Sequence, residues 1–102
     1  MSNLISITKV KDSKVDTLDF DSIALGRTFT DHMFVCDYED GQWKNPRITP
    51  MEFIPMHPAC MALHYGQALF EGMKATVDSN GTPFLFRPEK NAQRLNFSAR
   101  RL

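Results

Sequence analysis

Hydrophobic and polar residues alternate in the first half of the chain, and the alternation predicts strands. Residues 31–38, DHMFVCDY, are a good candidate for a strand. One face of this strand would carry four side chains, those of His32, Phe34, Cys36 and Tyr38. Residues 1–22 alternate only weakly before they turn acidic and polar, which predicts an extended amino-terminal arm with at most one strand.

A returning strand is predicted at residues 42–49, after a turn at 39–41 where Gly41 tolerates a positive φ. Pro46 cannot donate a backbone hydrogen bond, so it would confine this strand to a sheet edge or place a bulge in it. Residues 50–58 contain three prolines and predict an extended connection.

The second half predicts a short helix at 58–66, because Pro58 suits a first helical turn and Gly66 suits a helix end. A strand is expected at 68–77. The sequence DSNG at 78–81 then favours a hairpin.

The hairpin would return through residues 83–86, and Pro88 with Glu89 would open a last helix. Its apolar stripe comprises Ala92, Leu95, Ala99 and Leu102. The stripe still runs at the final residue, so we expect a chain that is cut within a longer sequence. The predicted fold class is α+β, a small domain with antiparallel strands or hairpins, a short helix and a carboxy-terminal helix.

Composition is that of an ordinary globular domain, with 42% hydrophobic and 24% charged residues among 102. This length predicts one domain with one core. Twelve basic residues balance twelve acidic ones, so no overall charge points to nucleic acid or an anionic membrane. Residues 87–102 hold five basic residues and one acidic residue, a local net charge of +4.

The two cysteines, Cys36 and Cys60, do not make a disulfide framework, and they predict a reducing compartment. We find no signal peptide and no apolar run of membrane-spanning length, which predicts a cytoplasmic protein. The three histidines lack the spacing of a metal site, so we expect structural roles for them and no bound metal.

Four residues could carry chemistry, and each also has a purely structural interpretation. Arg94 lies near the start of the last helix, where it could grip a phosphate or simply be solvated. Tyr65 and Phe70 could line an apolar pocket or lie in a core. Gly72, within a strand, indicates a bulge or a close approach to a ligand.

Three segments resemble the amino-terminal part of the branched-chain amino acid aminotransferases, which belong to fold type IV of the pyridoxal-phosphate enzymes. They are FTDHMF (29–34), HPACMALHYGQALFEGMKA (57–75) and FRPEKNAQRLNFSARRL (86–102). The resemblance begins near Leu25, so residues 25–102 are expected to be part of the small domain, preceded by an arm over 1–24. Relative to the family, that small domain would be truncated.

The resemblance implies a role for each candidate. Arg94 would bind the phosphate of pyridoxal 5′-phosphate, the cofactor. Tyr65, Phe70 and Gly72 would form part of the substrate pocket, with Tyr65 serving the neighbouring subunit of a homodimer. Leu25 occupies a position where several relatives carry a phenylalanine, so an aromatic contact is lost there.

The family's catalytic lysine, which forms the Schiff base, is expected to lie outside these 102 residues. Lys74, in the sequence GMK, does not match it. The catalytic set predicted for this chain is therefore empty, and the chain alone should be inactive.

The resemblance implies amino transfer between leucine, isoleucine or valine and 2-oxoglutarate in the intact enzyme. Two alternatives remain open. One is another fold type IV enzyme, a D-amino acid aminotransferase or an aminodeoxychorismate lyase. The other is a non-enzymatic binding or dimerisation module built on the same small domain.

Overall fold

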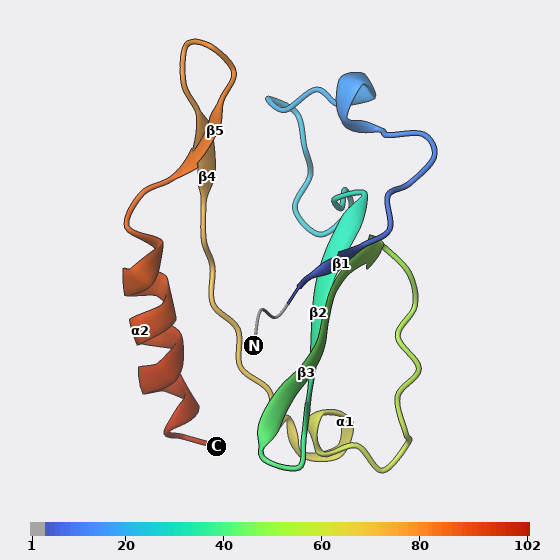
Figure 1. Ribbon diagram of the computed structural model, residues 1–102, viewed down its shortest axis with the longest axis vertical. Helices are drawn as coiled ribbons and strands as arrows, with labels where there is room; N and C mark the ends of the chain where they lie inside the picture. The colour runs from blue at the N-terminus through green and yellow to red at the C-terminus, as the bar shows by residue number, and fades with distance from the viewer. Residues whose placement is uncertain (1–3) are drawn as a thin grey trace. The chain divides into compact units, whose positions relative to one another are not determined.

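The computed structural model describes residues 4–102 (Figure 1). The chain divides into two compact units, and the boundary falls between Ile54 and Pro55. The first unit holds β1 (Ser6–Ile7), the 3-10 helix η1 (Val15–Thr17), β2 (His32–Glu39) and β3 (Gln42–Pro50). The second unit holds α1 (Met61–Tyr65), β4 (Ala75–Val77), β5 (Pro83–Leu85) and α2 (Pro88–Ala99). No helix within these described residues is long and apolar enough to cross a membrane.

The first unit is built on a three-stranded sheet in the order β1-β3-β2. Strands β2 and β3 pair antiparallel, as the alternating pattern predicts, and the turn at Asp40–Gly41 has positive φ at both residues. β1 pairs with β3 in parallel, with Ser6 opposite Arg47. This parallel pairing is not evident from the sequence, because a two-residue strand carries almost no periodic signal.

A bulge interrupts β3 at its proline. The register shifts between Val35 and Asp37, so Asn45 and Pro46 together lie opposite Cys36. Asn45 has a φ of 52°, a conformation that asparagine tolerates better than most residues. β3 is the middle strand of the sheet, so the proline is accommodated by a bulge and not by an edge position.

In the second unit, helix α1 is shorter than the sequence predicts. It begins at Met61, and Pro58 lies in the preceding turn, where the Cys60 amide donates to the His57 carbonyl at 2.9 Å. The predicted end is confirmed. Gly66 closes the helix with a φ of 62°, a left-handed conformation that glycine adopts at little cost.

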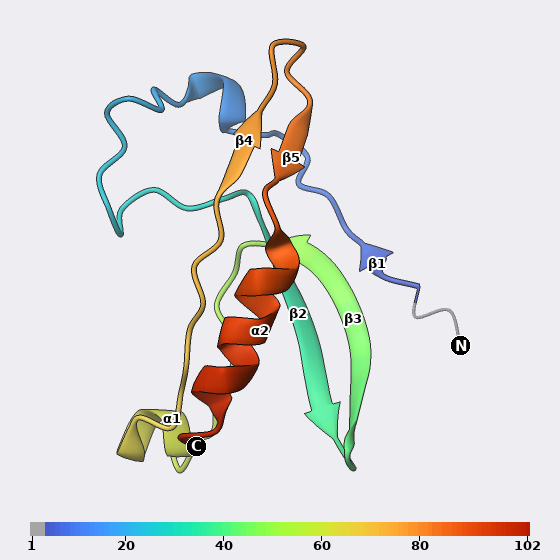
Figure 2. The same cartoon turned by 90° about the vertical axis from the view of Figure 1, so that its left-hand side faces the viewer.

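The strand expected at 68–77 is also shorter, since only Ala75–Val77 pairs with another strand. A strand can form inter-strand hydrogen bonds only where a neighbouring strand lies beside it. The partner strand β5 ends at Leu85, and the chain then turns into α2 at Arg87, whose φ is 49°. Residues 68–74 therefore lack a partner strand. Figures 1 and 2 both show this segment running alongside α2.

The predicted hairpin turn at 78–81 is confirmed, and one carboxylate organises it. Asp78 Oδ1 accepts hydrogen bonds from the amides of Asn80 at 2.8 Å and Thr82 at 2.9 Å. Gly81 provides the positive φ of 78° that the turn requires. The short β4–β5 ribbon is therefore specified largely by its turn.

The single core expected from the chain length is not present in residues 4–102, because no hydrophobic side chain there is fully buried. Helix α2 begins at Pro88 as predicted but ends at Ala99, so Leu102 of the predicted apolar stripe lies outside it, and Leu95 on that stripe is exposed. A core needs two packed layers. The first unit has one small sheet, and the second has one hairpin and an extended segment beside one longer helix.

Candidate functional site

Arg94 of α2 forms a two-pronged ion pair with Glu71 of the extended segment. The Arg94 Nε donates to Glu71 Oε2 at 2.6 Å, and Nη2 donates to Glu71 Oε1. One edge of the planar guanidinium thus donates two parallel hydrogen bonds to the carboxylate. This bidentate geometry is among the strongest for an ion pair. The two residues are 23 positions apart, so this contact fixes the segment against the helix.

Asn91 completes the contact one helical turn earlier. Its Nδ2 donates to Glu71 Oε1 at 3.2 Å and to the Gly72 carbonyl at 2.8 Å. Arg94 Nη2 also reaches the Gly72 carbonyl at 3.4 Å. Residues at i and i+3 share one face of a helix, so Asn91 and Arg94 together grip the backbone and the side chain of the Glu71–Gly72 pair.

The ion pair changes the acidity of both partners. Hydrogen bonds from Arg94 lower the pKa of Glu71 to about 2, against the opposing effect of burial, and the bond from Asn91 acts in the same direction. The carboxylate in turn raises the pKa of Arg94. Both groups are therefore charged throughout the physiological pH range.

The candidate residues are only partly brought together. Arg94 and Gly72 meet, as described. Phe70 lies on an open groove of about 460 Å³ with Met73 and Leu95, but 91% of its surface is exposed. Tyr65, at the end of α1, is 78% exposed, and it contributes nothing to the lining of that groove.

Gly72 has open space where a side chain would project, so nothing in residues 4–102 requires a glycine there. Its φ is not in the left-handed region either. The sequence-based prediction that a ligand lies close to the Gly72 backbone therefore stays a prediction.

Sequence reasoning missed Glu71 and Asn91 as members of this site. Glu71 in isolation has the pattern of an exposed or paired strand residue. Its partner on α2 is too distant in sequence for any spacing rule. The motif NAQR does place Asn91 and Arg94 at helical spacing, and that signal could have identified the shared face.

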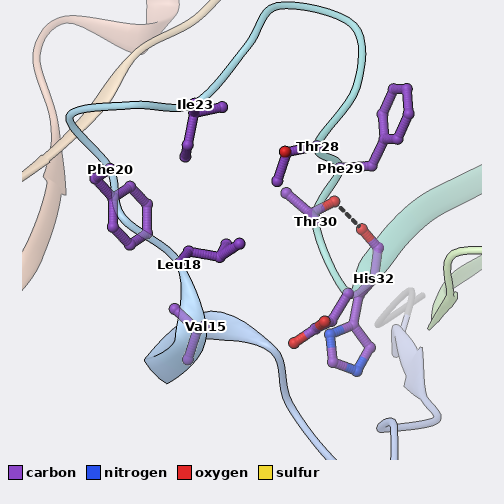
Figure 3. A pocket seen from close by; sticks show the side chains of 9 residues that line it. Val15, Leu18, Phe20, Ile23, Thr28, Phe29, Thr30 and His32 are labelled. Atoms are coloured by element: carbon purple, nitrogen blue, oxygen red, sulfur yellow. Dashed lines mark hydrogen bonds between the residues drawn. The ribbon is translucent and has the colours of Figure 1, made fainter.

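A separate hollow of about 320 Å³ lies in the first unit, and the sequence does not predict it (Figure 3). Its wall is mostly apolar and comprises Val15, Leu18, Phe20, Ile23 and Phe29. Thr30, Asp31 and His32 add polar groups to the wall, and Figure 3 shows Thr30 and His32 beside each other.

These polar groups are engaged with the protein itself. Thr30 Oγ1 donates to the His32 carbonyl at 2.6 Å, and Asp31 Oδ2 accepts from Ser13 Oγ at 2.6 Å. The Ser13 bond lowers the pKa of Asp31, although burial opposes it, and the Lys14 amide contributes in the same direction. These polar groups therefore hold the amino-terminal arm to the start of β2.

Two histidines have structural roles of the expected kind. His32 Nε2 accepts the Val10 amide at 2.9 Å, and His57 Nδ1 accepts the Ala59 amide at 3.0 Å. Within residues 4–102 no group of three metal-ligating side chains gathers, and both cysteines are free thiols.

The guanidinium of Arg94 has the donor chemistry that suits a phosphate group. The guanidinium has five N–H groups, and its bonds within residues 4–102 use Nε and Nη2. The Nη1 nitrogen makes none of them, and 64% of the Arg94 side chain is exposed. Arg94 therefore keeps N–H groups that its bonds to Glu71 and Gly72 do not use.

Comparison with curated proteins identifies several branched-chain-amino-acid aminotransferases as relatives. Branched-chain-amino-acid aminotransferase 2 of Bacillus subtilis (strain 168) is 48% identical over 99 residues, which are 96% of this chain and 26% of that protein. Branched-chain-amino-acid transaminase 1 of the same strain is 47% identical over 85 residues, 82% of this chain and 24% of that protein. No family model matches the chain.

A eukaryotic relative shows the same relationship. The mitochondrial branched-chain-amino-acid aminotransferase of Schizosaccharomyces pombe (strain 972 / ATCC 24843) is 42% identical over 95 residues, 92% of this chain and 22% of that protein. The chain spans about a quarter of the length of these curated relatives. Over nearly all of its own length, the chain therefore corresponds to one part of a branched-chain-amino-acid aminotransferase.

Proposed function

We propose that the intact protein is a pyridoxal 5′-phosphate-dependent aminotransferase of fold type IV, and that this chain is its amino-terminal part. It would move an amino group between leucine, isoleucine or valine and 2-oxoglutarate. The observation that carries the proposal is the 48% identity to a branched-chain-amino-acid aminotransferase over 96% of the chain.

The proposed task of Arg94 in this reaction is to hold the cofactor by its phosphate. The cofactor, when bound, supplies an electron sink for the negative charge that develops at the substrate α-carbon. Arg94 is suited to phosphate because its guanidinium is a planar fork of donors and stays protonated. Glu71 keeps one edge of that fork in place, and the Nη1 side stays available for the anion.

The proposed substrate pocket includes Tyr65, Phe70 and Gly72. Phe70 and Tyr65 are large aromatic side chains that stand out from the chain, an arrangement that suits contact with an aliphatic substrate or with a second subunit. Such a pocket distinguishes aliphatic side chains weakly, because one methylene contributes only about 1–3 kcal/mol. We therefore propose that all three branched-chain amino acids are accepted.

We further propose a cytoplasmic homodimer, without nucleic-acid or membrane partners. The exposed apolar side chains support the presence of further contacts, because soluble proteins rarely leave so many uncovered. Sedimentation of the intact protein at several concentrations measures the oligomeric state. A single species with the mass of one chain would contradict the dimer.

Amino-donor profiling of the intact protein tests the proposed reaction. With 2-oxoglutarate as acceptor, leucine, isoleucine and valine should all serve as donors, and D-alanine should not. Preference for D-amino acids would indicate a D-amino acid aminotransferase. Consumption of aminodeoxychorismate would indicate the lyase. If the intact protein neither binds the cofactor nor turns over any substrate, the alternative of a non-enzymatic binding or dimerisation module is favoured.

A further inference from the structure

The Glu71–Arg94 pair is unequal in its burial. Glu71 exposes 11% of its side chain, whereas Arg94 exposes 64%. Glu71 accepts hydrogen bonds at both carboxylate oxygens, from Arg94 and from Asn91. The carboxylate is thus the anchored partner, and the guanidinium extends outward from it.

Asn91 connects this anchor to the backbone. Its single amide nitrogen joins Glu71 Oε1 and the Gly72 carbonyl. It lies on the same helix face as Arg94, so the helix itself holds the carboxylate in position for the arginine. A long arginine side chain otherwise samples many rotamers, and this contact selects the one observed.

Two outcomes are possible when an anion approaches Arg94. The anion could displace Glu71 from the fork, in which case Glu71 is a competitor. Alternatively, it could bind the Nη1 side while Glu71 stays in place. The anchoring of Glu71 by Asn91 and its burial favour the second outcome.

We propose that Glu71 and Asn91 are positioning residues, which hold the Arg94 guanidinium with its Nη1 side toward the phosphate of the cofactor. This inference rests on the proposed function, which assigns pyridoxal phosphate to the protein. It concerns the orientation of Arg94, and it assigns neither residue a contact with the cofactor.

The Glu71→Gln variant separates a positioning residue from a competitor by the sign of its effect. Removing a nearby negative charge should, by electrostatics alone, strengthen phosphate binding. Loss of positioning should instead weaken phosphate binding. We expect a loss of about tenfold, which is the size of effect seen when a residue that orients a metal ligand is removed. We expect pyridoxal phosphate, titrated into the apo form of the intact protein, to bind about tenfold more weakly to this variant. Unchanged or tighter binding would overturn the inference.

Glu89→Gln is the matched control. Glu89 is an exposed carboxylate in the first turn of the same helix, and its ion pair with Arg87, at 3.7 Å, does not involve Arg94. This variant should bind the cofactor as well as the unsubstituted protein, or slightly more tightly. A loss equal to that of Glu71→Gln would show a general charge effect and would overturn the inference.

A second comparison separates positioning from a general structural role. In an Arg94→Ala background, Glu71→Gln and Asn91→Ala should cause no further loss of cofactor affinity, because their positioning effect acts through the arginine. Additional tenfold losses in that background would overturn the inference. No binding by the unsubstituted protein would overturn the proposed function as well, which distinguishes the two failures.

One measurement uses the unsubstituted protein, so it does not depend on whether a variant folds. In the intact apo protein labelled with ¹⁵N-arginine, inorganic phosphate should shift the Arg94 Nη signals and leave the Nε–H signal in its hydrogen-bonded position. If phosphate moves the Nε–H signal away from its hydrogen-bonded chemical shift, the anion displaces Glu71, and the inference is overturned.

Discussion

The guanidinium of Arg94 and the carboxylate of Glu71 meet as a fork, with Nε and Oε2 at 2.6 Å, although 23 positions separate the two residues in the chain. The pair joins α2 to the extended segment before β4. It also leaves Arg94 largely exposed.

Replacing Arg94 by alanine should weaken pyridoxal phosphate binding to the intact protein by at least roughly tenfold, since it removes a charge-assisted phosphate contact. Lysine should restore only part of the affinity, because it offers a point charge in place of a fork. Cofactor titration of the apo protein measures both effects.

Arg100→Ala is the control for that prediction. Arg100 lies at the end of α2, with its guanidinium 5.5 Å from the centre of the Phe97 ring. Its removal should leave cofactor affinity nearly unchanged. Equal losses for Arg94→Ala and Arg100→Ala would show that Arg94 is an ordinary surface arginine.

The carboxyl group of Glu71 should titrate far below other glutamates. Its pKa lies at about 2 because of the hydrogen bonds from Arg94, whereas the ordinary value is 4.5. A lowered pKa means that the contribution of the ion pair to stability is complete above pH 4.5 and disappears as the pH falls through about 2. Carboxyl ¹³C shifts followed against pH measure this midpoint. A midpoint near 4.5 would show that the pair does not form in solution.

Asn45 should tolerate glycine but not valine, because its φ of 52° is strained for a β-branched residue. Valine should destabilise the β2–β3 ribbon by about 1–2 kcal/mol. Hydrogen exchange of the β2–β3 amides in the intact protein measures the free energy of local opening. Gln42→Val, at an exposed site on the same strand, serves as the control. Similar losses at both sites would contradict the role assigned to the bulge.

Borohydride fixation should attach pyridoxal phosphate to no lysine of this chain in stoichiometric amount, because none lies in the motif expected for the Schiff-base residue. Peptide mapping after reduction of the intact protein identifies the labelled site. Scattered, partial labelling of surface lysines is compatible with the prediction. Complete labelling at one position would refute it, and the positions concerned are Lys9, Lys11, Lys14, Lys44, Lys74 and Lys90.

Local chemistry explains which parts of the fold could be predicted. The turn at Asp78–Gly81 and the helix end at Gly66 depend on residues within a few positions of each other, and both form where expected. Pro46 predicts an edge position or a bulge, and the bulge is the one that forms, because the missing amide donor acts on its own strand.

The sequence alone determined the relationship of this chain to the branched-chain aminotransferases, the order of the strands and helices from β2 to α2, and the turns between paired strands. These features follow from residue identity and from contacts between near neighbours. The helix predicted at 58–66 and the strand predicted at 68–77 are both shorter in the structure. Their lengths depend on which backbone groups find hydrogen-bond partners, and the sequence pattern does not show this.

Only the tertiary structure decided that Glu71 belongs with Arg94. No periodic pattern connects residues 23 positions apart. Their meeting depends on the path of the chain through Gly72, the β4–β5 hairpin and the turn into α2. A carboxylate that appears ordinary in the sequence therefore becomes the anchor of the arginine, because the fold closes the distance between them.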